Sequence, residues 1–234
     1  MSQTSEASAA VHARGLGRHF GRNWALAHAD LDIVSGEVVL LAGANGSGKT
    51  TLLRLIAGLW KPSRGTLSVF GKSPTAERLA CRRLLSLVAH DNFLYDRLTP
   101  LETLRAWSRL LGRGADDEEL EALLDEVELG SRKNSQVGGF SAGMKKRLTL
   151  LRTRLERPKL ILLDEPFSAL DAAGRRLIEK WIRSSSAGGQ TVVMASHDLR
   201  RASRICQRAI LLEQGQIVWR GPAEGVLERA EVAR

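Results

Sequence analysis

Apolar residues fall into short uninterrupted runs that alternate with segments in which apolar positions recur at helical spacing. In Glu37–Ala42 a run of apolar residues precedes a glycine, which is typical of a buried strand, and Thr51–Gly58 has the spacing of a helix. Similar runs predict strands at 160–163, 191–195 and 209–212, with a turn at Gln214-Gly215 into 216–219. Strands that alternate with helices indicate an α/β fold, a mostly parallel sheet with helices on both faces.

The stretch 92–155 has a helical pattern without strand-like runs. Thr99–Glu102 is a capping box with proline at the first helical position, and it predicts a helix that runs toward Leu111. Asp116 or Asp117 caps the next helix. The apolar stripe of that helix consists of Leu120, Leu123, Leu124 and Val127.

These patterns divide the chain into a tail and one domain with two lobes. Residues 1–10 are small and polar, and we expect them to be a disordered tail. The domain, 11–234, has a core lobe built from 11–90 and 157–234. The helical lobe, 91–156, is inserted into it.

Composition limits the compartment and the class of protein. With 43% hydrophobic residues, a chain of 234 residues can bury a sizeable core. No apolar run approaches the roughly 18 to 20 residues of a membrane-spanning helix, and no basic-then-apolar signal peptide opens the chain. Cys81 and Cys206 lie far apart in no metal spacing, as expected for buried free thiols in a reducing compartment. We therefore expect a soluble, cytoplasmic chain.

The net charge of +9 is compatible with nucleic acid, an anionic membrane surface or small anionic ligands as partners. Lys and Arg are scattered along the chain, with the densest cluster at Lys145-Lys146-Arg147. Most of this charge is expected to be solvated surface, so charge alone decides nothing about function.

One glycine-rich segment has the pattern of a phosphate-binding loop, G-x-x-x-x-G-K-[ST], between a predicted strand and a predicted helix. Glycines let the backbone N–H groups turn toward a phosphate chain, and the helix N-terminus adds positive potential. Lys49 is expected to reach the β- and γ-phosphates, and the Thr50 hydroxyl to ligate Mg²⁺. The expected nucleotide-binding residues are Gly43, Ala44, Asn45, Gly46, Ser47, Gly48, Lys49, Thr50 and Thr51.

A second buried strand ends in two carboxylates, Asp164 and Glu165. Asp164 is placed to hold Mg²⁺ through water, and Glu165 to polarise the water that attacks the γ-phosphate. His197 follows the next strand and emerges at the same carboxyl edge, where such sheets bind ligands. We expect His197 to contact the γ-phosphate.

Two further motifs flank this carboxylate pair: Phe140–Met144 lies upstream and Ser168–Asp171 downstream. With the phosphate loop and His197, they resemble the motif series of ABC transporter ATPases. The resemblance extends over 11–227. It implies a RecA-like P-loop NTPase core with N-terminal antiparallel strands and an inserted α-helical lobe, and it implies ATP and Mg²⁺ as ligands.

The resemblance also implies a head-to-tail homodimer, in which Ser141 and Gly143 of one subunit cover the ATP bound by the other. Phe20 aligns with the aromatic residue that stacks on adenine in the family, and Trp24 is the alternative. The partner implied is a separate transmembrane permease, docked near Phe93–Tyr95. The chain would then be peripheral on the inner face of the cell membrane.

Ser141 has the residue type of an N-cap for a helix over 142–156, which Pro158 ends. Such an N-terminus is an anion site. The basic residues of 145–147 oppose the helix dipole, at a cost of ~0.3–1 kcal/mol each if exposed. Either nucleotide bound across the dimer offsets this cost, or these residues form a solvated basic face.

The chain departs from the family pattern at two places. His90 stands where most members have glutamine, and because imidazole is a poor ligand for Mg²⁺ it is expected to act through water. The signature reads Ser141-Ala142-Gly143-Met144, without the usual second glycine and glutamine. Both features, and the segment 94–102, are similar to the ATP-binding subunit of the heme exporter of cytochrome c maturation.

The resulting interpretation is an ATP-hydrolysing transporter subunit, with heme as the candidate cargo. The alternatives are the ATPase of another exporter, of drugs, lipids or polysaccharides, and a soluble ABC ATPase that acts on nucleic acid. The chain lacks the second ATPase unit, coiled coils and zinc clusters usual in the latter. A regulatory module without turnover is disfavoured by the intact Lys49, Asp164, Glu165 and His197.

Overall fold

The computed structural model describes residues 9–89 and 94–232 and separates into two compact units. The core unit comprises the chain up to Leu87, Pro158–Pro166 and the chain from Ile182 onward. The helical unit comprises Val88–Arg157 and Phe167–Trp181. The core lobe expected over 157–234 is interrupted, because Phe167–Trp181 belongs to the helical unit.

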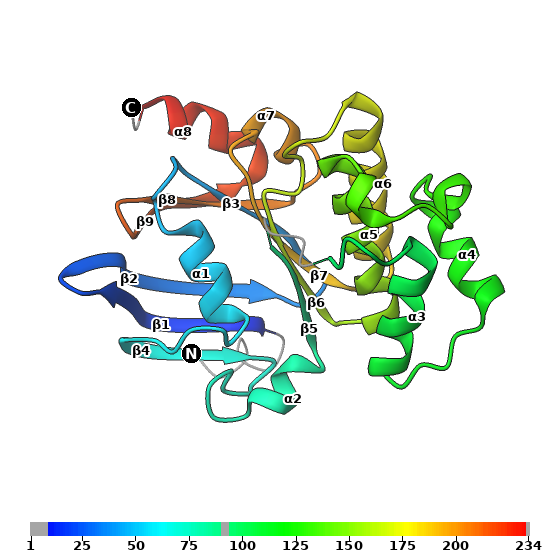
Figure 1. Ribbon diagram of the computed structural model, residues 1–234. Helices are drawn as coiled ribbons and strands as arrows, with labels where there is room; N and C mark the ends of the chain where they lie inside the picture. The colour runs from blue at the N-terminus through cyan, green and yellow to red at the C-terminus, as the bar shows by residue number, and fades with distance from the viewer. Residues whose placement is uncertain (1–8, 90–93, 233–234) are drawn as a thin grey trace. The chain divides into compact units, whose positions relative to one another are not determined.

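Within the described residues, nine strands form one sheet in the order β4-β1-β2-β9-β8-β3-β7-β6-β5 (Figure 1). Strand β3 pairs in parallel with β7 and β8, and β6 pairs in parallel with β7. Strand β1 pairs antiparallel with β2 and β4, so the expected α/β sheet with N-terminal antiparallel strands is confirmed. The strands are β1 Ala9–Phe20, β2 Asn23–Val34, β3 Val38–Ala42, β4 Arg64–Val69, β5 Leu85–Val88, β6 Leu160–Asp164, β7 Thr191–Ala195, β8 Arg208–Glu213 and β9 Gln216–Pro222.

The central strands are buried on both faces. Every residue of β3, β6 and β7 is buried, which explains why these segments are continuous apolar runs rather than alternating ones. Helix α1 (Lys49–Ile56) packs its leucines into the core cluster that also holds Leu16, Leu26 and Leu41. This packing places the start of α1 beside the carboxyl end of β3.

The other helices are α2 Arg78–Arg82, α3 Pro100–Leu110, α4 Asp117–Glu126, α5 Ala142–Glu156, α6 Ala172–Ala187, α7 Leu199–Ala202 and α8 Val226–Val232. The three caps expected in the helical unit are confirmed: Thr99 caps α3, Asp116 caps α4 and Ser141 caps α5. Of the stripe predicted for α4, Leu120, Leu124 and Val127 are buried, and Leu123 packs partly buried against the same cluster.

Two details differ from the expectations. Strand β1 begins at Ala9, so Ala9 and Ala10 belong to the sheet rather than to the tail; residues 1–8 lie outside the described chain. Both cysteines are free, but Cys206 is only half-buried. Among the described residues, no helix has the length and apolar composition needed to cross a bilayer.

Candidate nucleotide site

The phosphate loop connects β3 to α1 through backbone conformations that favour glycine. Gly43, Gly46 and Gly48 have φ values of 138°, 79° and 107°. A Cβ on Gly43 would collide with the carbonyl oxygen of Leu212, and one on Gly48 would lie 2.6 Å from the carbonyl oxygen of Ala25. Glycine is therefore required at Gly43 and Gly48 by conformation and by space, before any ligand is considered.

The Lys49 side chain lies over this loop. Its ammonium donates hydrogen bonds to the carbonyl oxygens of Gly43 and Ala44, both at 2.8 Å, and the residue is buried. Burial lowers the pKa of Lys49, while the negative charges of Glu165 and Asp164 oppose that shift. The loop thus holds a buried cation where a phosphate chain would lie.

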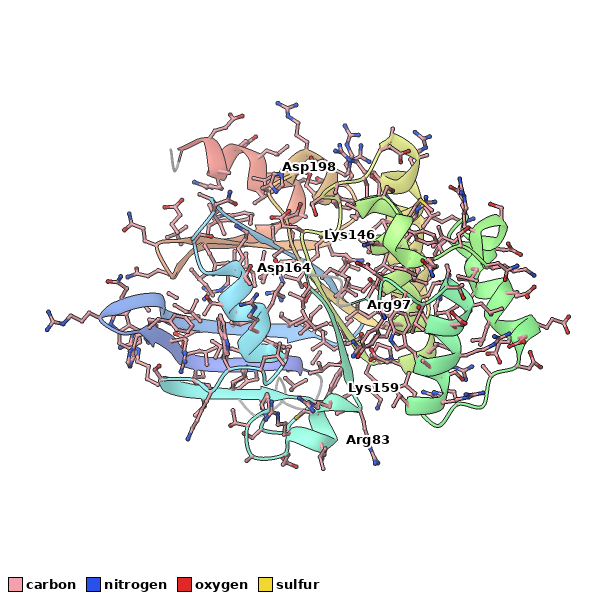
Figure 2. All side chains as sticks on the ribbon, viewed as in Figure 1. Arg83, Arg97, Lys146, Lys159, Asp164 and Asp198 are labelled. Carbon is pink, nitrogen blue, oxygen red and sulfur yellow. The ribbon has the colours of Figure 1, made fainter. Side chains whose placement is uncertain are left out.

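Thr50 and Asp164 meet at the end of β6, where Figure 2 labels Asp164. The Thr50 hydroxyl donates to Asp164 Oδ2 at 3.0 Å, and Asp164 is buried. A hydroxyl and a carboxylate are the hard oxygen donors that Mg²⁺ prefers. The buried Ser47 Oγ also has no hydrogen-bond partner among the described residues, as expected where a ligand supplies one. These residues fit a magnesium–nucleotide complex.

Glu165 and His197 face each other at the same edge of the sheet. Glu165 has a left-handed φ of 51°, and its N–H donates to the carbonyl oxygen of Ala195 at 2.9 Å. His197 Nδ1 lies 2.8 Å from Glu165 Oε2, and the His197 side chain is 67% exposed against 17% for Glu165. An ionised carboxylate only accepts, so Nδ1 carries the hydrogen in this contact. His197 therefore orients Glu165 and presents its other ring nitrogen to solvent.

The core unit brings together Lys49, Thr50, Asp164, Glu165 and His197. Their places after buried strands predicted that they would meet at one edge of the sheet. Thr51 is buried in the first turn of α1. Ser141 and Gly143 lie at the start of α5 in the helical unit: Ser141 Oγ accepts from Met144 N at 3.2 Å, and Gly143 is half-buried. Their contact with nucleotide stays a prediction.

The three basic residues at 145–147 of α5 have partners within the helical unit. Lys145 pairs with Asp96 at 2.8 Å, and Arg147 pairs with Glu128 at 3.1 Å. Lys146 is buried and is bound within its own unit. Of the two alternatives left open by the sequence, a solvated face does not describe Lys146, whereas the ion pairs of Lys145 and Arg147 lie at the surface.

The aromatic candidates lie at the turn between β1 and β2. Phe20 is 43% exposed, so it is not a core residue; Trp60 meets it edge-on with ring centroids 4.9 Å apart. The Arg18 guanidinium lies 4.8 Å from the Phe20 ring centroid. Trp24 is 45% exposed and lies under Arg64. Trp60 was not anticipated, because a lone tryptophan after a helix carries no periodic or motif signal.

His90 and Phe93 lie outside the described residues. Of the residues expected near a permease, Leu94 packs partly buried against the core of the helical unit, whereas Tyr95 is 74% exposed. Leu94 therefore contributes to the packing of the helical unit, and Tyr95 remains available for a partner.

The sheet, the phosphate loop and the carboxylate pair define a P-loop NTPase-like α/β protein. Comparison with known proteins gives its family: the ABC transporter family matches residues 26–168. The chain belongs to that family and is an ATP-binding subunit of an ABC transporter. Such subunits generally bind ATP with Mg²⁺, hydrolyse it, dimerise and associate with membrane permeases.

Two curated relatives and two solved structures illustrate the similarity. The ABC transporter ATP-binding protein NatA of Bacillus subtilis is 34% identical, over 85% of this chain and 82% of its own. The Nod factor export ATP-binding protein I of Rhizobium sp. strain N33 is 31% identical, over 94% and 73%. An ATP-binding subunit of an ABC transporter superposes with a TM-score of 0.82 at 28% identity, over 95% of this chain and 93% of its own. A dimeric ATP-binding cassette, in a post-hydrolysis state bound to ADP and Pi, gives 0.80 at 27%, over 91% and 98%.

Proposed function

We propose that this chain hydrolyses ATP with Glu165 as the base and that the hydrolysis drives a separate membrane permease. The observation that carries the proposal is the contact between Glu165 Oε2 and His197 Nδ1 at 2.8 Å. That contact lies in the same unit as the buried Lys49 and the Thr50–Asp164 pair. A cation for phosphate, oxygen donors for Mg²⁺ and an oriented carboxylate therefore occur together.

The chemistry follows from what each group can do. The loop amides and Lys49 bind the β- and γ-phosphates, which are held by charge-assisted hydrogen bonds. Thr50 and, through water, Asp164 would hold Mg²⁺, which when bound neutralises charge on the phosphate oxygens. Glu165 orients a water molecule and accepts its proton as the water oxygen bonds to the γ-phosphorus. The bond from that phosphorus to ADP breaks, and ADP leaves with the electron pair.

His197 holds Glu165 in this role. Its Nδ1–H restricts the carboxylate, so the carboxylate need not reorganise when the water binds. The exposed remainder of the imidazole is free to meet the γ-phosphate of a bound nucleotide. We keep the adenine contact as part of the proposal, with Phe20 or Trp24 providing the ring.

In the working cycle that we propose, ATP closes two copies head to tail, and hydrolysis reopens them. Ser141 and Gly143 of each copy then cover the nucleotide of the other. The start of α5 supports this role, because the N-terminus of this fifteen-residue helix carries positive potential, which favours an anion. We place the protein at the inner face of the membrane, through its permease.

Export is the transport direction we propose, since one relative reported above is named for Nod factor export. Heme is a narrower hypothesis, which rests on His90, the Ser141–Met144 signature and the segment 94–102. None of the relatives reported above is named for heme, so the proposal itself stops at export. The neighbouring genes test the narrower hypothesis, which requires membrane proteins of cytochrome c maturation among them.

Glu165→Gln tests the catalytic proposal. The substitution keeps the shape and removes the base, so hydrolysis should fall at least about a hundredfold while ATP affinity stays near wild type. Steady-state phosphate release and equilibrium binding of Mg-ATP measure the two quantities on purified protein.

The matched control is Glu228→Gln, the same change on an exposed residue of α8, which should leave turnover unchanged. Wild-type turnover in Glu165→Gln would exclude Glu165 as the base. Phosphate release that requires DNA or RNA would favour the nucleic-acid class instead.

A further inference from the structure

Lys146 is a buried cation in the second turn of α5 (Figure 2). It is 4% exposed, and its ammonium donates to Ser168 Oγ at 2.7 Å. Burying an ammonium group is costly unless it is hydrogen-bonded, so this contact is a specific feature of the helical unit. Neither the nucleotide chemistry nor the capping of α5 accounts for it.

A second close approach lies one turn earlier on the same helix. A Cβ on Gly143 would lie 3.1 Å from the carbonyl oxygen of Ala169 and 3.2 Å from Leu170 Cδ2. Residues three apart share one face of a helix, so Gly143 and Lys146 face the same segment. We call that segment, 167–171, the post-glutamate loop.

The post-glutamate loop is also fastened at its far end. Arg175 Nε donates to the carbonyl oxygen of Leu170 at 3.0 Å, and Asp171 Oδ1 accepts from Gly174 N at 2.7 Å. Both contacts tie the loop to the first turn of α6, within the helical unit. The loop is therefore held between the signature helix α5 and the start of α6.

One of the places where the chain passes from the core unit to the helical unit lies directly before this loop. Pro166 ends the core segment Pro158–Pro166, and Phe167 begins the helical segment Phe167–Trp181. Glu165, the proposed base, is thus separated by a single residue from a loop that belongs with α5. The short connection between Glu165 and the post-glutamate loop is therefore one of the four places where the chain joins the two units.

We propose that Lys146 is a positioning residue that fastens the post-glutamate loop to α5, so that a movement of the signature helix is transmitted to the chain at Glu165. The inference rests on the proposed function, because it concerns the base of that reaction. Lys146 itself touches neither nucleotide nor water in this role. Its contribution is to make the two segments move as one body.

Lys146→Met tests the linkage. It keeps most of the length of the unbranched side chain and removes the donor, so the loop should loosen from α5 while the nucleotide-binding residues of the core unit are untouched. We expect kcat to fall about tenfold or more and the ATP affinity of the monomer to stay within about twofold. Amide hydrogen exchange should accelerate in a peptide covering 167–171 and stay unchanged in one covering α3.

Three further single variants and one double variant sharpen the result. Lys145→Met makes the same change on the neighbouring lysine, which pairs with Asp96 instead, and should keep wild-type kcat. Lys146→Arg retains a donor and should recover part of the loss. Ser168→Ala removes the acceptor and should reproduce the loss, and the double variant with Lys146→Met should lose no more than either alone.

Wild-type kcat and wild-type exchange in Lys146→Met would overturn the linkage, and additive losses in the double variant would do the same. If Lys146→Met does not fold, Ser168→Ala carries both readouts. If the wild-type protein does not hydrolyse ATP, the proposed function is wrong. The link between Lys146 and the post-glutamate loop is still tested in that case, by hydrogen exchange in 167–171.

Discussion

Single residues of the phosphate loop are constrained before nucleotide arrives. The Lys49 ammonium bonds the carbonyl oxygens of Gly43 and Ala44, and burial lowers its pKa. A phosphate chain would offer this cation stronger, charged acceptors than two carbonyl groups. Bound phosphate would therefore stabilise the charged form of Lys49 more than the two carbonyl groups do.

Lys49→Ala removes that charge. ATP binding should weaken by about 1.5–3 kcal/mol, or roughly 10- to 150-fold, because a charge-assisted contact is lost. Isothermal calorimetry with Mg-ATP measures the change, and Lys180→Ala, on an exposed lysine, is the control. Unchanged affinity would remove Lys49 from the site.

At this scale, motif spacing predicts the residues that do chemistry. Lys49, Thr50, Asp164, Glu165 and His197 follow buried strands, so their meeting at one sheet edge could be derived. The Lys146–Ser168 contact could not, because it joins residues 22 apart that share no periodic pattern. The sequence shows only that Lys146 lies in a helix, and a buried lysine in a helix cannot be distinguished from a solvated one by sequence alone.

At the scale of elements, the helices begin where their caps lie. In α3, Thr99 Oγ1 accepts from Glu102 N at 3.2 Å, and Glu102 Oε2 accepts from Thr99 N at 2.8 Å. The backbone hydrogen bond from Thr99 lowers the pKa of Glu102. Capping residues are local in sequence, which is why the start of α3 could be predicted to the residue.

The lowered pKa makes the stability of α3 depend on pH. A carboxyl group with a depressed folded-state pKa stabilises folding above its unfolded pKa, and the gain is lost as the pH falls through the folded pKa. Glu102→Gln should therefore be less stable than wild type at neutral pH and equally stable in acid. Urea unfolding at both pH values measures this, and a difference that persists in acid would show that packing, rather than charge, is responsible.

Strands β3, β6, β7 and β8 were predicted from apolar runs and β9 from the turn before it, but the order of the strands in the sheet was not predicted. Strand β9 lies between β2 and β8, which joins the antiparallel strands to the parallel ones, and β3 lies between β7 and β8. Pairing between distant strands depends on tertiary packing, which periodicity does not encode. The alternation of strands and helices settles the class of sheet, whereas register and order need the structure.

At the scale of the whole molecule, the chain carries two functional parts on two units. The core unit holds the phosphate loop, the carboxylates and His197, and the helical unit holds Ser141 and Gly143. Motif order along the chain was enough to predict both parts and the family. The assignment of 167–181 to the helical unit was not predictable, because those residues follow the catalytic strand without a break in sequence.

The central claim is that ATP joins two copies and that each copy completes the other's site. Size-exclusion chromatography of Glu165→Gln with saturating Mg-ATP tests it most directly, because binding without hydrolysis should trap a dimer. Ser141→Arg added in that background should give a monomer that still binds ATP with unchanged affinity. A monomeric Glu165→Gln protein, or weaker ATP binding by the Ser141→Arg monomer, would contradict the claim.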